Sequence, residues 1–127
     1  MTTMRITIII FCLFLLSCSS SRMIETSLYF AQSRPDGSLI TEAEWNNFKE
    51  MHIAKVFTKG STTTKVIGTW YDPDAHKLIS ESTYVVTYFH KNSPLILRQI
   101  DSLKNLYVKM FQQQSVLRVD KKVQAHF

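Results

Sequence analysis

The stretch SRPDGSLITEAEW, residues 33–45, contains a turn that is followed at once by the start of a helix. Thr41 and Glu44 have the spacing of a capping box, in which each side chain satisfies a backbone N–H of the other residue. This pair predicts that a helix begins at Glu42. The stretch therefore marks the first change from strand to helix, and the elements on either side are read outward from it.

The turn within this stretch carries residue types suited both to a corner and to ligand binding. Pro35 fixes φ and Gly37 accepts a positive φ, which is the chemistry of a tight turn. Asp36 is explained as a turn residue, whereas Arg34 is a cation that could bind a small anionic ligand. We expect a structural corner in which Gly37 sets the backbone and Arg34 donates hydrogen bonds to neighbouring strand ends.

Periodicity predicts four strands and two helices. The strands are expected at residues 24–32, 62–71, 77–90 and 115–123, and the helices are expected to begin at Glu42 and Pro94. This order is that of a ferredoxin-like split βαβ sandwich (βαββαβ), an α+β fold with a four-stranded antiparallel sheet and two helices on one face. We expect the first and third strands to form the central pair and to run parallel, and the threonine-rich second strand to lie at an edge.

The same periodicities assign residues to the core. On the helices, 3.6-residue spacing selects Trp45, Phe48, His52, Val56, Ile96, Ile100, Leu103, Tyr107 and Met110. On the first strand, alternation places Ile24, Thr26, Leu28 and Phe30 on one face. On the last strand, alternation points Leu117 and Val119 inward and points Val116, Arg118 and Asp120 outward.

The N-terminal residues 1–17 have the charged, apolar and small-residue regions of a signal peptide. The apolar run from Ile6 to Leu16 is too short for a transmembrane helix, which needs about 20 residues. Leu15-Leu16-Ser17-Cys18 resembles a bacterial lipobox, and this resemblance implies that Cys18 is acylated and becomes the new N-terminus. The alternative is an ordinary secretory signal that is cut near Ser19.

If residues 15–18 are a lipobox, the chain divides into a signal peptide at 1–17, a lipidated cysteine and tether at 18–23, and a single α+β domain at 24–127. It implies membrane attachment through a lipid anchor. Ser19 is not the aspartate that retains many lipoproteins in the inner membrane. The expected location is therefore the bacterial cell envelope, at the periplasmic side of the outer membrane if the source has two membranes.

Composition narrows the classes of partner and chemistry. The 15 basic and 10 acidic residues are scattered, with no basic stripe, so nucleic acid is not an expected partner. These charges mainly indicate a solvated surface. They would also be compatible with a mild affinity for anionic lipid head groups or sugars. Cys12 leaves with the signal peptide and Cys18 would be acylated, so neither a disulfide nor a cysteine-based metal site is expected. The sequence contains no standard catalytic motif, and no metal or other cofactor is predicted.

Two candidate sites follow from the predicted topology. If the first and third strands ended at the same edge, Arg34 would lie near His90 and Lys91, beside two helix N-termini that favour anions. On the open face of the sheet, Tyr29 and Arg118 would be exposed. Tyr84, Val86 and Tyr88 would join them if they lie on the open face of the third strand, but the sequence leaves the face of that strand ambiguous. A second subunit, an envelope protein, a small ligand or the C-terminal residues 124–127 could cover that face.

The chain also resembles a family of small bacterial lipoproteins that is known only as a domain of unknown function. The resemblance rests on TSLYF, SRPDGSLITEAEW, IGTW and QQSVLRVD, in this order and between Glu25 and Val123. The segment AKVFTKGSTTTK, residues 54–65, departs from the family pattern, so the resemblance does not define the junction between the first helix and the second strand. It implies no activity.

Two functional hypotheses remain open at this stage. The first is a non-enzymatic envelope lipoprotein that binds a partner or ligand. The second is a small cofactor-independent enzyme in which Arg118, Tyr29 and His90 serve a pocket on the open sheet face of a homodimer, by analogy with other proteins of this fold. A buried polar cavity at that face would favour the enzyme, and a flat face would favour the binding protein.

Overall fold

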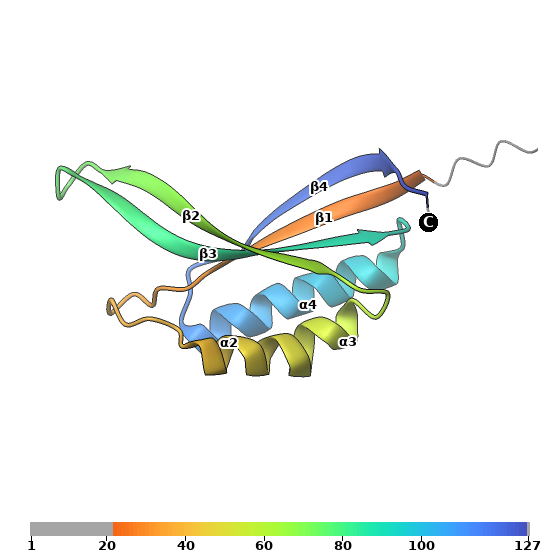
Figure 1. Cartoon of the computed structure of the whole chain (residues 1–127), viewed down its shortest axis with the longest axis horizontal. Coiled ribbons are helices and arrows are strands. Elements are labelled where there is room, and N and C mark those ends of the chain that lie inside the picture. The colour runs from red at the N-terminus through yellow and green to blue at the C-terminus, as the bar shows by residue number, and fades with distance from the viewer. Residues whose placement is uncertain (1–21, 127) are drawn as a thin grey trace, which may run out of the picture.

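The computed structural model describes residues 22–126, and it has the predicted α+β architecture, with helices on one face of an antiparallel sheet (Figure 1). Its elements in chain order are β1 Arg22–Ala31, α2 Glu42–Phe48, a π-helical turn Lys49–Ile53, α3 Ala54–Val56, β2 Thr62–Asp72, β3 Lys77–His90, α4 Pro94–Phe111 and β4 Leu117–Gln124. The predicted signal peptide, residues 1–17, and Cys18 lie outside the described residues.

The sheet order is β2-β3-β1-β4, and all neighbouring strands are antiparallel. The prediction that β1 and β3 form the central pair is confirmed, but the prediction that they run parallel is wrong. The first helical segment returns the chain so that β2 runs parallel to β1, and the β2–β3 hairpin then reverses direction. Ile24 therefore pairs with His90, and Ala31 pairs with Thr83. The ends of β1 and β3 lie at opposite ends of the molecule.

An aromatic cluster fills the space between the sheet and the helices. The ring of Phe30 on β1 lies 4.8 Å from that of Tyr107 and 5.5 Å from that of Trp45. Phe48 packs 5.0 Å from Tyr107 and 5.8 Å from Phe111. These residues are almost fully buried. The predicted inward face of β1 is confirmed, and it positions both helices against the same side of the sheet.

The first helical segment departs from the predicted core stripe after Phe48. The π-helical turn adds a residue to the helical period. As a result Ile53 and Phe57 are buried, at 1% and 3% exposure, whereas the expected His52 and Val56 are only partly buried. On α4, Phe111 takes the buried position expected for Met110, because i+4 from Tyr107 lies on the same face as i+3.

The predicted face of β4 is reversed, and the face of β3, which the sequence left ambiguous, is now defined. Tyr84, Val86 and Tyr88 lie on the helix side because they pair with Phe30, Leu28 and Thr26 of the inward face of β1. On β4, Arg118 and Asp120 pair with Leu28 and Thr26, and Leu117 pairs with Tyr29. Leu117 is consequently 57% exposed and Val116 is buried. β4 is an edge strand with aliphatic residues on both of its faces, so alternation alone does not show which face is buried.

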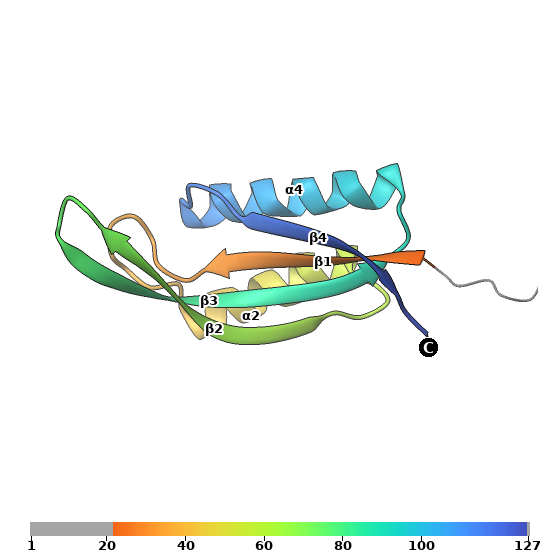
Figure 2. The same cartoon turned by 90° about the horizontal axis from the view of Figure 1, so that it is seen from above.

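The face of the sheet opposite the helices carries no further layer within residues 22–126 (Figure 2). Tyr29 lies on this face, as predicted. The C-terminal residues do not fold across it, because β4 continues to Gln124, which pairs with Arg22 at the start of β1. This pairing overturns the suggestion that residues 124–126 cover the face, and Phe127 lies outside the described part.

The domain is elongated, and different segments of the chain meet at its two ends (Figure 1). The start of β1, the end of β3, the end of β4 and the turn before β2 meet at one end, called here the N-terminal end. Residues 32–41, the β2–β3 hairpin and the turn between α4 and β4 meet at the other, called here the distal end.

Candidate binding site at the distal end

The corner formed by SRPDG is held by its own backbone. The N–H of Arg34 donates to the carbonyl of Ser38 at 2.8 Å, and the N–H of Gly37 donates to the carbonyl of Arg34 at 2.9 Å. Gly37 has φ of 83°, a conformation that L-residues adopt at a cost. Asp36 accepts hydrogen bonds from the side chain and then the backbone of Ser38, and these lower the pKa of its carboxyl. The predicted turn and the predicted role of Gly37 are confirmed.

The side chain of Arg34 is bound within the corner. Its guanidinium donates to the carbonyl of Leu39 at 2.9 Å and to Glu44 Oε1 at 2.6 Å, and it lies 5.7 Å from the ring centroid of Phe111. The structural role predicted for Arg34 is supported, but its partners are the corner and the first turn of α2, not neighbouring strand ends. Both terminal nitrogens of its guanidinium are therefore engaged within the fold.

The capping box predicted at the start of α2 is confirmed. The backbone N–H of Glu44 donates to Thr41 Oγ1, and the backbone N–H of Thr41 donates to Glu44 Oε2 at 2.8 Å. Hydrogen bonds from the backbone and side chain of Thr41, followed by that from Arg34, lower the pKa of Glu44. One carboxylate thus connects the helix start to the arginine of the corner.

Buried polar contacts fix the point at which β1 ends. The hydroxyl of Tyr107 donates to the carbonyl of Ala31 at 2.7 Å and accepts from Gln32 Nε2 at 3.1 Å. Burial raises the pKa of the Tyr107 hydroxyl far above its usual value, so it stays a donor at physiological pH. Gln113 Nε2 donates to the carbonyl of Ser33 at 2.9 Å. The corner is thereby attached to α4 and to the start of the α4–β4 turn.

Beyond this point β2 and β3 continue without β1, as a two-stranded arm made of residues 67–82. The last pair that β3 forms with β1 is Thr83 with Ala31, whereas β3 pairs with β2 as far as Lys77. The arm exposes large apolar side chains: Ile67 at 73%, Trp70 at 52%, Tyr71 at 58% and Leu78 at 67%. Exposed apolar side chains gathered on one arm are typical of an interaction surface.

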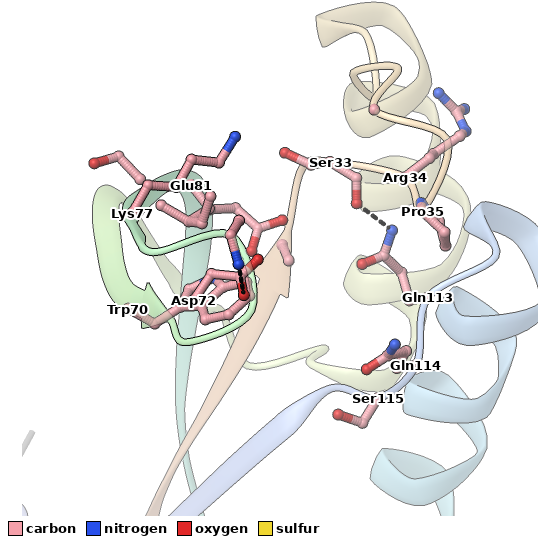
Figure 3. A pocket seen from close by; sticks show the side chains of 15 residues that line it. Ser33, Arg34, Pro35, Trp70, Asp72, Lys77, Glu81, Gln113, Gln114 and Ser115 are labelled. Carbon is pink, nitrogen blue, oxygen red and sulfur yellow. Dashed lines mark hydrogen bonds between the residues drawn. The ribbon is translucent and has the colours of Figure 1, made fainter.

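A cleft of about 760 Å³ lies between the arm, the corner and the α4–β4 turn (Figure 3). The arm contributes Trp70, Asp72, Lys77 and Glu81, and Gln113 and Gln114 face them from the opposite side. The cleft occupies the place where β1 would continue if it were as long as β3. Residues 77–81 of β3 pair only with β2 among the described residues, so one edge of this strand faces the cleft.

His90 does not join Arg34, which corrects the predicted anion site. The two residues lie at opposite ends because β1 and β3 are antiparallel. His90 is 5% exposed, its Nδ1 donates to the carbonyl of Lys91 at 2.9 Å, and its Nε2 is hydrogen-bonded to Thr26 Oγ1 at 2.8 Å. Both ring nitrogens are therefore used within the fold.

Arg118 does not join Tyr29 on the open face. It lies on the helix side of β4, where it pairs with Asp101 at 3.2 Å and with Asp120 at 2.9 Å. Burial opposes ionisation of Asp120, but hydrogen bonds from Arg118 and Thr26 outweigh it and lower its pKa. The residues predicted for the enzymatic alternative, Arg118, Tyr29 and His90, are therefore divided between two faces of the sheet.

Within residues 22–126 no group of three or more His, Cys, Asp or Glu side chains is arranged to bind a metal ion. Among the helices of the same residues, none combines the length and apolarity needed to span a bilayer.

The fold and the cleft define a small ferredoxin-like α+β protein with an extended hairpin arm. The sequence matches the family described as "Protein of unknown function (DUF3574)" over residues 25–127, and the chain belongs to this family. The predicted family membership is thus confirmed. A search of curated protein sequences finds no significant match.

Solved structures share the fold at low sequence identity. A phage SAM lyase in its apo state superposes with a TM-score of 0.59 at 9% identity, covering 88% of this chain and 97% of the lyase. The lyase in complex with S-methyl-5'-thioadenosine gives 0.58 at 10% identity, over 81% and 90%. CutA from Synechococcus elongatus gives 0.50 at 8% identity, over 82% and 79%. These similarities support the ferredoxin-like fold alone.

Sequence reasoning missed the cleft and its residues Trp70, Lys77 and Glu81. A signal was present in the unequal strand lengths, because the third strand was predicted to be several residues longer than the first. A hairpin longer than its neighbours must extend past the sheet. The sequence does not show how far the first strand turns away at the corner, and that turn is what opens the cleft.

Proposed function

We propose that this protein is an envelope lipoprotein that binds another envelope protein at its distal end, with Cys18 acylated as its membrane anchor. The lipobox-like residues 15–18 support the anchor. The exposed apolar side chains of the arm and the adjacent cleft support binding as the function. Membrane attachment at Cys18 places the bound partner in the envelope.

The observation that carries the proposal is the open strand edge beside the cleft. Within residues 22–126, the segment 77–81 of β3 pairs with a strand on one side only, and the cleft lies where a strand would be on the other side. An extended peptide can add to such an edge through main-chain hydrogen bonds, while pockets for its alternate side chains give specificity. Trp70 and Ile79 provide apolar surface, and Lys77 and Glu81 provide charges of both signs. The expected ligand is therefore an extended segment of a partner protein.

The enzymatic alternative receives no support from the residues predicted for it. Arg118 is engaged by Asp101 and Asp120, His90 is engaged on both nitrogens, and Tyr29 lies on the opposite face of the sheet from both. A SAM lyase shares the fold, but the fold alone does not carry an activity.

The anchor is tested by replacing Cys18. In a bacterial host fed a clickable fatty acid, the wild-type chain should be labelled and should fractionate with membranes. Cys18→Ala should lose the label and leave the membrane fraction. Equal labelling of the two proteins would reject acylation at this residue. If the host has two membranes, sucrose-gradient fractionation should place the wild type in the outer one.

Binding is tested by photo-crosslinking in living cells. A photoreactive amino acid at Ile79, in the cleft, should give one discrete protein adduct, and the same residue at Lys104 on α4 should give none. The adduct at position 79 should disappear when Trp70→Ala is added, because Trp70 lines the same cleft. Adducts of equal yield at both positions, or an adduct insensitive to Trp70→Ala, would reject a binding site in the cleft.

A further inference from the structure

The N-terminal end of the domain gathers basic side chains that are far apart in the sequence. Lys59 and Lys91 line one cleft of about 520 Å³ together with Met23, next to the start of β1. Arg22 begins the same strand, and Lys122 pairs with Ile24, which also pairs with His90. Lys121 lies beside them, and its charge is partly neutralised by Glu25, whose Oε1 lies 4.0 Å from Lys121 Nζ.

Charge is distributed unevenly along the long axis of the molecule. The distal end, taken with the adjoining first turn of α2 and last turn of α4, carries six acidic side chains, Asp36, Glu42, Glu44, Asp72, Asp74 and Glu81, against four basic ones, Arg34, Lys65, Lys77 and Lys109. The N-terminus of α4, where Ser93 makes no side-chain capping bond, adds the positive pole of a helix dipole at the other end. The scattered charges of the sequence are thus separated by the fold.

Apolar side chains accompany the basic ones. Leu95, in the first turn of α4, is 58% exposed, and Phe89, near the end of β3, is 37% exposed. Phe89 and Ile96 line the same cleft as Lys59 and Lys91. Basic residues around exposed apolar ones are the combination that binds the interface of an anionic membrane.

We infer that the N-terminal end lies directly on anionic phospholipid head groups of the membrane that holds the anchor. This inference rests on the proposed acylation of Cys18. Only residues 19–21 separate Cys18 from Arg22, so the chain between them spans at most about 14 Å. The attraction of basic residues to an anionic surface falls off over about 8 Å at physiological ionic strength, and so short a link keeps the basic end near that range. The distal cleft then faces away from the membrane.

Lysine footprinting of the full lipidated chain tests this orientation. The protein is reconstituted into nanodiscs of phosphatidylcholine alone or with phosphatidylglycerol, and amine acetylation is followed by peptide mass spectrometry. On the anionic discs, Lys59, Lys91 and Lys122 should react several-fold more slowly than on the neutral discs. Lys104 and Lys109 on α4 should react at equal rates on both. High salt should remove the protection, because it screens surface charge.

Two double variants that each remove two positive charges show whether the membrane attracts the basic N-terminal end or only the net charge of the protein. Lys91→Gln with Lys122→Gln should abolish the protection of Lys59, whereas Lys104→Gln with Lys109→Gln should leave it intact. Equal effects of the two variants, or equal acetylation on neutral and anionic discs while the protein remains anchored, would overturn the inference and leave the anchor standing. If Cys18 is not acylated, the full chain is added to vesicles from outside. Protection on anionic vesicles then supports the basic surface although the anchor is rejected, and no protection overturns it.

Discussion

The two ends of the molecule differ in how their polar groups are used. At the distal end, Arg34 and Glu44 form an internal network that holds the corner, and the nearby cleft stays open beside a free strand edge. At the N-terminal end, Lys59 and Lys91 extend from exposed positions around a small cleft, and Ser93 leaves the N-terminus of α4 without a side-chain cap. The corner at the distal end is therefore held by a charged side-chain pair, whereas Lys59 and Lys91 at the N-terminal end form no ion pair among the described residues.

This difference suggests that the distal end is pre-organised for binding, whereas the side chains of the N-terminal end become ordered only on contact with a binding surface. A pre-organised cleft loses less conformational entropy when a partner binds. Flexible lysines suit a membrane surface, where charge matters more than geometry. The same sheet can thus serve two interactions because its strands end at different places.

The largest expected effect comes from the core that both ends share. Phe30→Ala removes a fully buried ring from the centre of the aromatic cluster, which should lower the free energy of unfolding by about 3–5 kcal/mol. Phe89→Ala, at the N-terminal end, should lower it clearly less, because the Phe89 side chain is 37% exposed and has less apolar surface to lose from burial. Urea denaturation of both variants measures the difference. Similar losses would show that Phe89 is packed, contrary to its exposure.

The two helix N-termini should respond differently to loss of a hydroxyl. Thr41→Ala breaks the capping box of α2 and should cost about 1 kcal/mol. Ser93→Ala should be nearly neutral, because Ser93 makes no side-chain capping bond at the start of α4. Thermal denaturation of the matched pair tests this contrast. A larger loss for Ser93→Ala would reverse the assignment of a pre-organised and an open end.

Arg34→Ala separates the corner from a binding loop. If Arg34 is structural, the variant should lose up to about 1 kcal/mol of stability through its partly exposed pair with Glu44. Added phosphate should then shift the melting temperatures of wild type and variant equally. Stabilisation by phosphate that disappears in the variant would instead identify an anion site at the corner. Gly37→Ala should destabilise without altering the response to phosphate, because φ is positive there.

The smallest expected effect concerns the hydrogen-bonded side chains of Thr26, Asp120 and Arg118. The pKa of Asp120 lies lower in the folded protein than its ordinary value of 3.8, through Arg118 and Thr26. Its contribution to stability is therefore fully present above about pH 4 and is lost as the pH falls through the lower, folded value. The stability gap between wild type and Asp120→Asn should narrow between pH 6 and pH 3. A gap that stays constant over this range would show that the carboxylate charge does not matter.

Local features of the fold were largely predicted correctly from the sequence, whereas the relative placement of sites was not. The capping box at Thr41, the turn at Gly37 and the inward face of β1 depend on neighbouring residues, and all three are confirmed. The face of β4 depends on register with β1, and the separation of Arg34 from His90 depends on strand direction. The register of β4 is set by tertiary pairing, which alternation within one strand does not specify. The opposite directions of β1 and β3 were already implied by the predicted antiparallel sheet with these two strands at its centre, and the expectation that they run parallel was inconsistent with that sheet.

The π-helical turn illustrates a second limit. A strict helical period selects His52 and Val56, but the added residue brings Ile53 and Phe57 into the core. Ile53 and Phe57 together have more apolar surface than His52 and Val56. Burying that surface outweighs the weaker hydrogen-bond geometry of the π-helical turn. Comparing the burial of both candidate stripes would have been needed to predict the turn.

The orientation of the domain on the membrane is the central claim, and fluorescence quenching tests it most directly. Single cysteines at Asn92, next to Lys91, and at Asp74 carry the same fluorophore in the lipidated protein, in which the proposed acylation blocks the thiol of Cys18. Discs containing anionic lipid and a head-group nitroxide lipid should strongly quench the probe at position 92 and leave the probe at position 74, in the hairpin, unquenched. Equal quenching at both positions, or stronger quenching at position 74, would contradict a basic end on the membrane and a binding cleft facing away from it.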